Sequence, residues 1–204
     1  MIEVERKFLP PTDGLENLVE GFTASPTKTN DDKYFDTADY TLTARNWWLR
    51  VRNGKFELKI AQNQEQTGFP IDVFDELETD EEIYAALKVA KTASGLAEDL
   101  TAAGYTPFAH LATERTKYSN GTMIIDIDHV VSLVDDVAPF SYDLLEIEVM
   151  VETEEEVAVA QEKIYAFAAA RGLVTGYTPG KVLTYLKQCR PEQYNVLRDN
   201  GIAP

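Results

Sequence analysis

Hydrophobic and polar residues alternate with a period of two along several stretches of the chain, which is the pattern of half-buried β-strands. Residues 2–8, 69–78 and 142–151 carry this pattern, with ionisable residues on the polar side. Those residues are Glu3, Glu5 and Lys7 in the first stretch, Glu76 in the second, and Glu146 and Glu148 in the third. Each predicted strand therefore has one mostly apolar face, which in the first stretch also carries Arg6, and one face that carries the charged residues.

The dipeptide Asn-Gly at 53–54 separates two alternating runs and predicts a β-hairpin with a two-residue turn. That turn places Arg50 opposite Glu57 and Trp48 opposite Lys59. One face of the hairpin then gathers Trp48, Arg50, Arg52, Lys55, Glu57 and Lys59. The other face is apolar throughout, and it includes Trp47, so we expect Trp47 to be a core residue.

A second Asn-Gly, at 120–121, predicts another hairpin. With a two-residue turn, Ser119 pairs with Thr122 and Arg115 lies opposite Asp126. The same face also carries Thr113, Lys117 and Asp128. This hairpin therefore repeats the separation of charged and apolar faces.

Helical periodicity appears in the gaps between strands and towards the end of the chain. It predicts helices at 13–20, 79–91, 155–171, 179–189 and 191–200. Thr153 and Glu156 form a capping-box pattern, while Pro179 and Pro191 are placed at first helical positions. We find no internal repeat or linker, so we expect one α+β domain over residues 1–204.

Composition and net charge exclude several classes of function for this chain. The chain has 204 residues, of which 44% are hydrophobic, enough for a sizeable core. Its net charge of -16 argues against nucleic acid or an acidic membrane surface as a partner. A single cysteine, Cys189, fits a reducing compartment and a buried thiol. We see no run of about 18 apolar residues and no signal-peptide pattern, and we expect a cytoplasmic monomer.

The charged strand faces have two interpretations. They could form a solvated exterior, as in many antiparallel sheets. Alternatively, a closed antiparallel barrel would turn the apolar faces outward beneath the helices and leave the charged faces lining a channel. Carboxylates in such a channel would attract Mg²⁺ or Mn²⁺, and arginine and lysine would bind phosphate. The second interpretation predicts a metal-bound polyphosphate inside the barrel.

The sequence at 3–7, EVERK, matches the ExExK motif of the CYTH superfamily, the triphosphate tunnel metalloenzymes. Further matching segments are YFDT at 34–37, LRVR at 49–52, FELK at 56–59, ER at 114–115, DID at 126–128 and EIE at 146–148. Within the superfamily, the chain resembles the thiamine triphosphatases through IEVERKFLP, WLRVR and GKVLTYLKQCRPEQY. The resemblance implies a closed eight-stranded antiparallel barrel with peripheral and C-terminal helices.

The resemblance also implies roles for individual residues. The metal would be bound by Glu3, Glu5, Asp126, Glu146 and Glu148, with Glu76 acting through water. The triphosphate would be bound by Lys7, Arg50, Arg52, Lys59, Arg115 and Lys181, of which Arg50, Arg52 and Lys59 are candidate catalytic residues. Lys181 rests on the resemblance alone. Trp48 would stack on the cationic thiazolium ring, and Tyr34 is placed at the channel mouth.

The activity implied is hydrolysis of thiamine triphosphate to thiamine diphosphate and phosphate. The alternatives are an inorganic tripolyphosphatase, a class IV adenylyl cyclase and a polyphosphate-binding module without catalysis. A carrier of apolar ligands would need an apolar lumen, which the pattern does not predict. Lys59, or a water held by a carboxylate, is the candidate base, whereas His110 and His129 are expected to be structural or surface residues.

Overall fold

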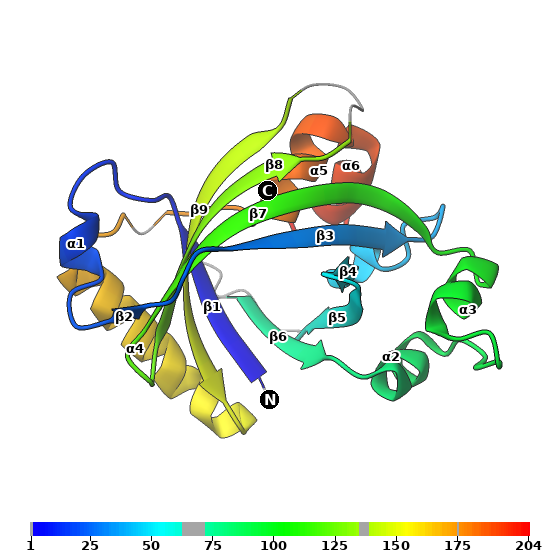
Figure 1. Cartoon of the computed structure of the whole chain (residues 1–204), viewed down its shortest axis with the longest axis horizontal. Coiled ribbons are helices and arrows are strands. Elements are labelled where there is room, and N and C mark those ends of the chain that lie inside the picture. Colours follow the sequence, from blue (N-terminus) through cyan, green and yellow to red (C-terminus); the bar gives the residue numbers. More distant parts are fainter. Residues whose placement is uncertain (1, 63–71, 135–138, 175) are drawn as a thin grey trace.

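Antiparallel pairing closes most of the strands of this protein into a ring (Figure 1). The computed structural model describes residues 2–62, 72–134, 139–174 and 176–204. Its strands are β1 (Ile2–Phe8), β2 (Thr23–Ala24), β3 (Lys28–Asp36), β4 (Trp47–Arg52), β5 (Lys55–Ala61), β6 (Asp72–Leu77), β7 (Thr106–Ser119), β8 (Ile124–Ser132) and β9 (Ser141–Val151). They pair in the order β2-β7-β3-β4-β5-β6-β1-β9-β8, and β8 also pairs with β7. This closes the predicted eight-stranded barrel, with the short β2 as an extra strand.

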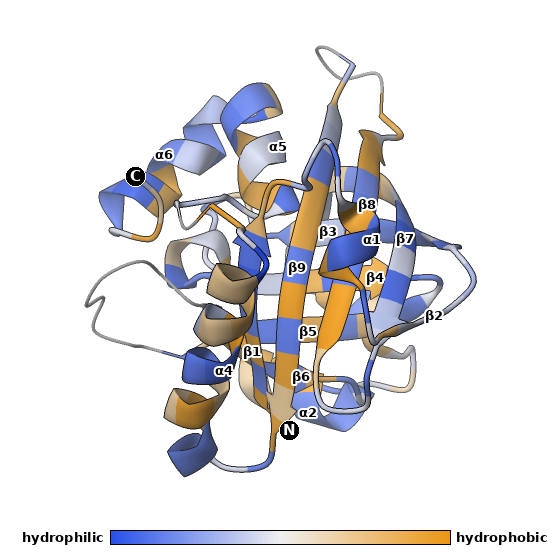
Figure 2. Ribbon diagram, turned by 90° about the vertical axis from the view of Figure 1, so that its left-hand side faces the viewer, coloured by the Kyte–Doolittle hydropathy of each residue, from blue (hydrophilic) through white to orange (hydrophobic). Residues whose placement is uncertain are grey.

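Helices pack around the barrel and over one end of it. They are α1 (Leu15–Leu18), α2 (Asp80–Leu87), α3 (Leu96–Ala102), α4 (Val157–Ala170), α5 (Lys181–Cys189) and α6 (Pro191–Asp199), with 3₁₀ helices η1 (Thr43–Arg45) and η2 (Glu154–Glu156). In Figure 2, α4 lies along β1 and β9, whose ribbon colours alternate between hydrophobic and hydrophilic. None of the helices in the described residues combines the length and the apolar character needed to cross a bilayer.

The apolar strand faces point outward beneath these helices, as predicted. Val4, Ile125 and Ile147 are fully buried in one cluster with Ile164 of α4. Arg6 shares the outward direction, and it is buried because its guanidinium stacks 4.9 Å from the Tyr165 ring and donates a hydrogen bond to the Tyr165 hydroxyl. Side chains alternate along a strand, so the charged faces must point into the barrel.

The first predicted hairpin forms with its expected register. Arg50 pairs with Glu57 and Trp48 pairs with Lys59 across β4 and β5. The turn residues Asn53 and Gly54 have φ values of 50° and 86°, the left-handed conformation that tight hairpin turns need.

The predicted register of the second hairpin was wrong by two residues. Ser119 pairs with Ile124, and Arg115 pairs with Asp128 in place of Asp126. The loop has four residues because the Asn120 side-chain oxygen accepts hydrogen bonds from the backbone N–H groups of the two residues that precede Ile124. A shift of two residues leaves every side chain on its predicted face, since the period of a strand is two.

Several helix boundaries differ from the predictions. The capping-box helix α2 ends at Leu87 because Lys88 adopts a left-handed conformation with φ 55°. Pro179 does not begin a helix: its carbonyl accepts a hydrogen bond from the Tyr142 hydroxyl, and α5 begins at Lys181. The capping box at 153–156 forms, but it opens η2 before α4 begins.

Pro191 begins α6 as predicted. Strand β3 was not among the predicted strands, although YFDT was identified as a matching segment. For the strand expected at 69–78, residues 69–71 lie outside the described residues, and β6 occupies 72–77.

Candidate active site

The barrel encloses a cavity of about 590 Å³, which is within the usual size range of small-molecule sites. Ionisable side chains reach it from β1, β4, β5, β6, β7 and β9 and from the first residue of α5. They are Glu3, Glu5, Lys7, Arg50, Arg52, Lys59, Glu76, Arg115, Lys117, Glu146, Glu148 and Lys181, and Arg45 of η1 also lines the cavity. The charged faces predicted for the separate strands therefore line one common cavity.

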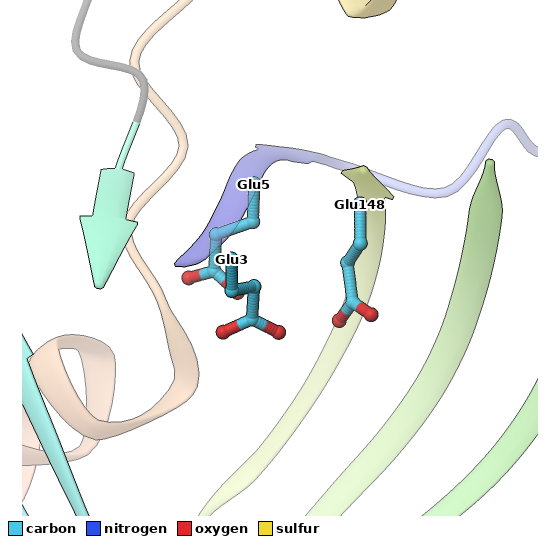
Figure 3. Close-up of side chains that lie close together, drawn as sticks. All are labelled: Glu3, Glu5 and Glu148. Atoms are coloured by element: carbon cyan, nitrogen blue, oxygen red, sulfur yellow. The ribbon is translucent and has the colours of Figure 1, made fainter. Parts of the chain in front are cut away.

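Buried carboxylates form two groups on one side of this cavity. Glu3, Glu5 and Glu148 make up the first group, in which each residue offers an oxygen within 4.8 Å of the others (Figure 3). Asp126 and Glu146 form the second group with the same Glu148. Clustered carboxylate oxygens are the ligands that hard divalent cations prefer.

These carboxylates carry more negative charge than their surroundings favour. Burial raises the pKa of Glu5 to about 7, against the opposing effect of Lys7 and Lys59. Burial and the neighbouring Glu3 raise the pKa of Glu148 well above its usual value. Among the described residues, Asp126 Oδ1 is buried without a hydrogen-bond partner. A divalent cation would offset this negative charge and would coordinate the unpaired oxygen of Asp126. The carboxylates of the two groups are therefore suitable metal ligands.

Arg115 connects the second carboxylate group to the rest of the wall. Its guanidinium binds both oxygens of Asp128 at 2.6 Å, one oxygen of Glu146 at 2.6 Å, and Asp126. Burial alone would raise the pKa of Glu146, but Arg115 and Lys7 lower it to about 2. Asp126 and Asp128 lie behind Arg115 and are almost fully buried. Arg115 therefore keeps the Glu146 carboxylate in its charged form.

On the opposite wall, the basic residues are paired with acids. Arg50 Nε donates a hydrogen bond to Glu57 at 2.8 Å. Arg52 binds both oxygens of Asp32 at 2.7 and 2.9 Å, and Lys181 Nζ lies 3.1 Å from Asp32. Burial opposes the ionisation of Asp32, but Arg52 and Lys181 hold its pKa far below the usual range. Asp32 thus fixes two candidate phosphate-binding cations.

Sequence reasoning missed Asp32. It shares the inward face of β3 with Tyr34, and this parity was a usable signal, because YFDT begins two residues after it. Tyr34 lines the cavity and is only 2% exposed, so it lies in the interior and not at an open mouth.

Lys59 lies among three carboxylates. It forms ion pairs with Glu3, with Glu76 at 3.1 Å and with Glu5 at 3.7 Å. Burial disfavours its charge, but Glu3, Glu5 and Glu76 outweigh that effect and raise the pKa of Lys59. A protonated amine cannot accept a proton, so the expectation that Lys59 acts as a base is not supported by its surroundings.

Part of the cavity wall is apolar. It is formed by Tyr34, Trp48, Ala61, Phe74, Val182, Leu183 and Ile202. Trp48 is 7% exposed, and Trp47 lies on the outer face against the cluster of α2 and α3. The two tryptophans therefore occupy the inner and outer faces that their parity predicted.

Other residues considered from sequence lie away from the cavity. His110 contacts Asp31 at 2.8 Å and His129 contacts Asp143 at 2.6 Å, in exposed pairs. Cys189 is buried in the core beside α6. The structure gives these residues surface or packing positions, as expected.

Comparisons with known proteins show which family has this sequence and fold. The CYTH domain profile matches residues 1–175. Human thiamine-triphosphatase is 34% identical over 206 residues, covering 97% of this chain and 89% of that protein, and the Macaca fascicularis thiamine-triphosphatase is 33% identical over the same shares. A solved protein from Pyrococcus horikoshii OT3 superposes with a TM-score of 0.60 at 19% identity, covering 91% of this chain and 99% of the other. The chain is a member of the CYTH family.

Proposed function

We propose that this protein hydrolyses thiamine triphosphate to thiamine diphosphate and phosphate inside its barrel, with a divalent metal ion. The observation that carries the proposal is the cavity inside the barrel, in which buried carboxylates face arginines and lysines. The relationship to human thiamine-triphosphatase at 34% identity supports the choice of substrate.

We propose Glu3, Glu5, Asp126, Glu146 and Glu148 as metal ligands, with Glu76 acting through water. Mg²⁺ or Mn²⁺, when bound, would supply positive charge that offsets the triphosphate oxygens in the transition state. The supporting observations are the two carboxylate groups and the unpaired oxygen of Asp126.

The triphosphate would be bound by Lys7, Arg50, Arg52, Lys59, Arg115 and Lys181. Phosphoryl transfer is catalysed mostly by positioning and charge stabilisation, so fixed cations suit it. Arg50, Arg52 and Lys59 would stabilise the negative charge on the phosphate oxygens in the transition state, as water attacks the terminal phosphorus and thiamine diphosphate departs. Because Lys59 is held as a cation, we assign activation of the attacking water to a carboxylate that holds it.

The thiazolium ring would lie on the apolar part of the wall, with Trp48 as its stacking partner. Trp48 pairs with Lys59 across the hairpin. A substrate whose triphosphate binds at Lys59 would therefore place its organic group near the indole.

The charged residues of the cavity would also bind inorganic tripolyphosphate. An inorganic tripolyphosphatase is therefore the main alternative. A phosphate-release assay with thiamine triphosphate, tripolyphosphate and ATP, with Mg²⁺ and with EDTA, tests the proposal. We expect metal-dependent release with the highest kcat/KM for thiamine triphosphate. A higher value for tripolyphosphate would favour the alternative, cyclic AMP formed from ATP would indicate a cyclase, and tight binding without release would indicate a binding module.

We also propose that residues 1–204 form a single domain that acts as a cytoplasmic monomer without nucleic-acid or membrane partners. Lys181 of α5 reaches the cavity and pairs with Asp32 of β3, so the C-terminal helices complete the barrel site. Light scattering of the purified protein would test the monomer, and a dimer mass would contradict it.

A further inference from the structure

Two segments that are distant in sequence line the cavity near Trp48. Asn46 follows η1 and directly precedes β4, which carries Trp48, while Asn200, Gly201 and Ile202 come from the turn after α6. Trp48 and Ile202 belong to the same hydrophobic cluster. The position of the indole therefore decides the shape of this part of the cavity.

One hydrogen bond orients the Trp48 side chain. Its indole N–H donates to the side-chain oxygen of Asn46 at 2.8 Å. The indole has a single donor and no acceptor, and Trp48 is 7% exposed, so leaving that N–H unpaired would be costly. Loss of the acceptor would favour another orientation of the ring.

The backbone holds Asn46 in place for this role. Asn46 adopts the left-handed conformation, with φ 57° and ψ 40°, which asparagine tolerates better than most residues. Its N–H donates to the carbonyl of Thr43 at 3.0 Å, which ends η1. A side chain on a fixed backbone is a precise acceptor.

The preceding 3₁₀ helix is itself anchored to the C-terminal helices. Buried Asp36 accepts hydrogen bonds from the backbone N–H of Thr43 at 2.9 Å and from its hydroxyl at 2.6 Å. The Thr43 hydroxyl in turn accepts a hydrogen bond from Gln193 of α6 at 2.8 Å. The two segments near Trp48 are thus joined through a buried polar chain.

We propose that Asn46 is a specificity-positioning residue, which fixes the Trp48 indole and so favours a triphosphate that carries an aromatic cation over a bare triphosphate. The assignment rests on the proposed thiamine triphosphatase function. Asn46 acts through Trp48, and it has no part in binding the phosphates in this assignment.

The test compares two substitutions at one position. Asn46→Gly removes the acceptor and keeps a residue that adopts positive φ easily, whereas Asn46→Asp keeps a side-chain oxygen acceptor. We expect Asn46→Gly to lower kcat/KM for thiamine triphosphate by about tenfold, chiefly through KM, as loss of one buried hydrogen bond predicts. The fall for tripolyphosphate should be much smaller, and Asn46→Asp should retain most of the preference.

A binding measurement gives a second readout. The chain has two tryptophans, so a Trp47→Phe background leaves Trp48 as the single indole reporter. We expect thiamine diphosphate to quench its fluorescence in that background, and Asn46→Gly to weaken the quenching.

Equal losses on both substrates would overturn the assignment, because they would indicate a role only in shaping the turn. An unchanged preference in Asn46→Gly would also overturn it. Wild-type protein without a preference for thiamine triphosphate would overturn the proposed function itself, and the assignment with it.

Discussion

The two walls of the channel bury charge in different ways. On the wall formed by β3, β4 and α5, Arg52 and Lys181 share one buried counter-charge, Asp32. On the wall formed by β1, β8 and β9, carboxylates lie close to one another, and the pKa values of Glu5 and Glu148 are raised. Like charges that are buried close together cost stability, so a cation would stabilise the acidic wall, whereas the basic wall already contains a carboxylate between two of its cations. The difference supports the proposed placement of the metal on the acidic wall.

Removal of a shared carboxylate should have the largest effect. Glu148 belongs to both carboxylate groups, so we expect Glu148→Gln to lower Mg²⁺-dependent kcat/KM by about 100-fold or more. The same substitution removes one buried like charge, and we expect the melting temperature in EDTA to stay level or rise. Glu81→Gln, which removes an exposed carboxylate paired with Lys91, is the control. Full activity in Glu148→Gln would contradict the assignment of the metal.

Loss of a carboxylate from the basic wall should lower the stability of the protein, in contrast to Glu148→Gln. Asp32→Asn leaves Arg52 and Lys181 without their buried counter-charge, and we expect it to destabilise the protein by about 3–5 kcal/mol in urea unfolding. Tripolyphosphate would replace the missing negative charge, so it should raise the melting temperature of the variant more than that of the wild type. The neighbouring Asp31→Asn, on the outer face beside His110, should change neither quantity appreciably. A stable Asp32→Asn protein would show that the basic wall does not depend on this pair.

The pH dependence should separate the walls further. The pKa of Glu5 is raised from 4.5 to about 7 on folding, so the folded chain binds more protons, and metal-free stability is lost as pH rises through that window. A metal ion needs the deprotonated carboxylates. We therefore expect millimolar Mg²⁺ to raise the melting temperature more at about pH 8 than at about pH 5.5. An equal shift at both pH values would contradict metal binding on the acidic wall.

Much of this contrast follows from side-chain parity in the sequence. Glu3, Arg50 and Glu148 could be placed in the channel because period-two alternation fixes faces regardless of the exact pairing. For the same reason, the two-residue error at Arg115 left it on the correct face. Parity cannot show which charged side chains pair with each other, because that depends on closure of the barrel.

The hydrophobic pattern by itself did not identify Lys181, Asp32 or Asn46. Lys181 lies at the start of a helix, and it enters the cavity because α5 packs on the barrel and its amine meets Asp32, 149 residues away. Asp32 lies on a strand rich in polar residues, for which the hydrophobic pattern is weak. Asn46 depends on a left-handed turn that forms only with η1.

The apolar part of the cavity carries neither set of charges, and a substitution there should have the smallest effect. Trp48→Phe keeps a ring but lacks the indole N–H and some stacking surface, so we expect kcat/KM for thiamine triphosphate to fall by about three- to tenfold. Hydrolysis of tripolyphosphate should fall less, because that substrate has no ring to stack. Trp47→Phe alters the outer face alone and is the matched control. Equal losses on the two substrates in Trp48→Phe would mean that the indole supports the charged walls and does not select the organic group.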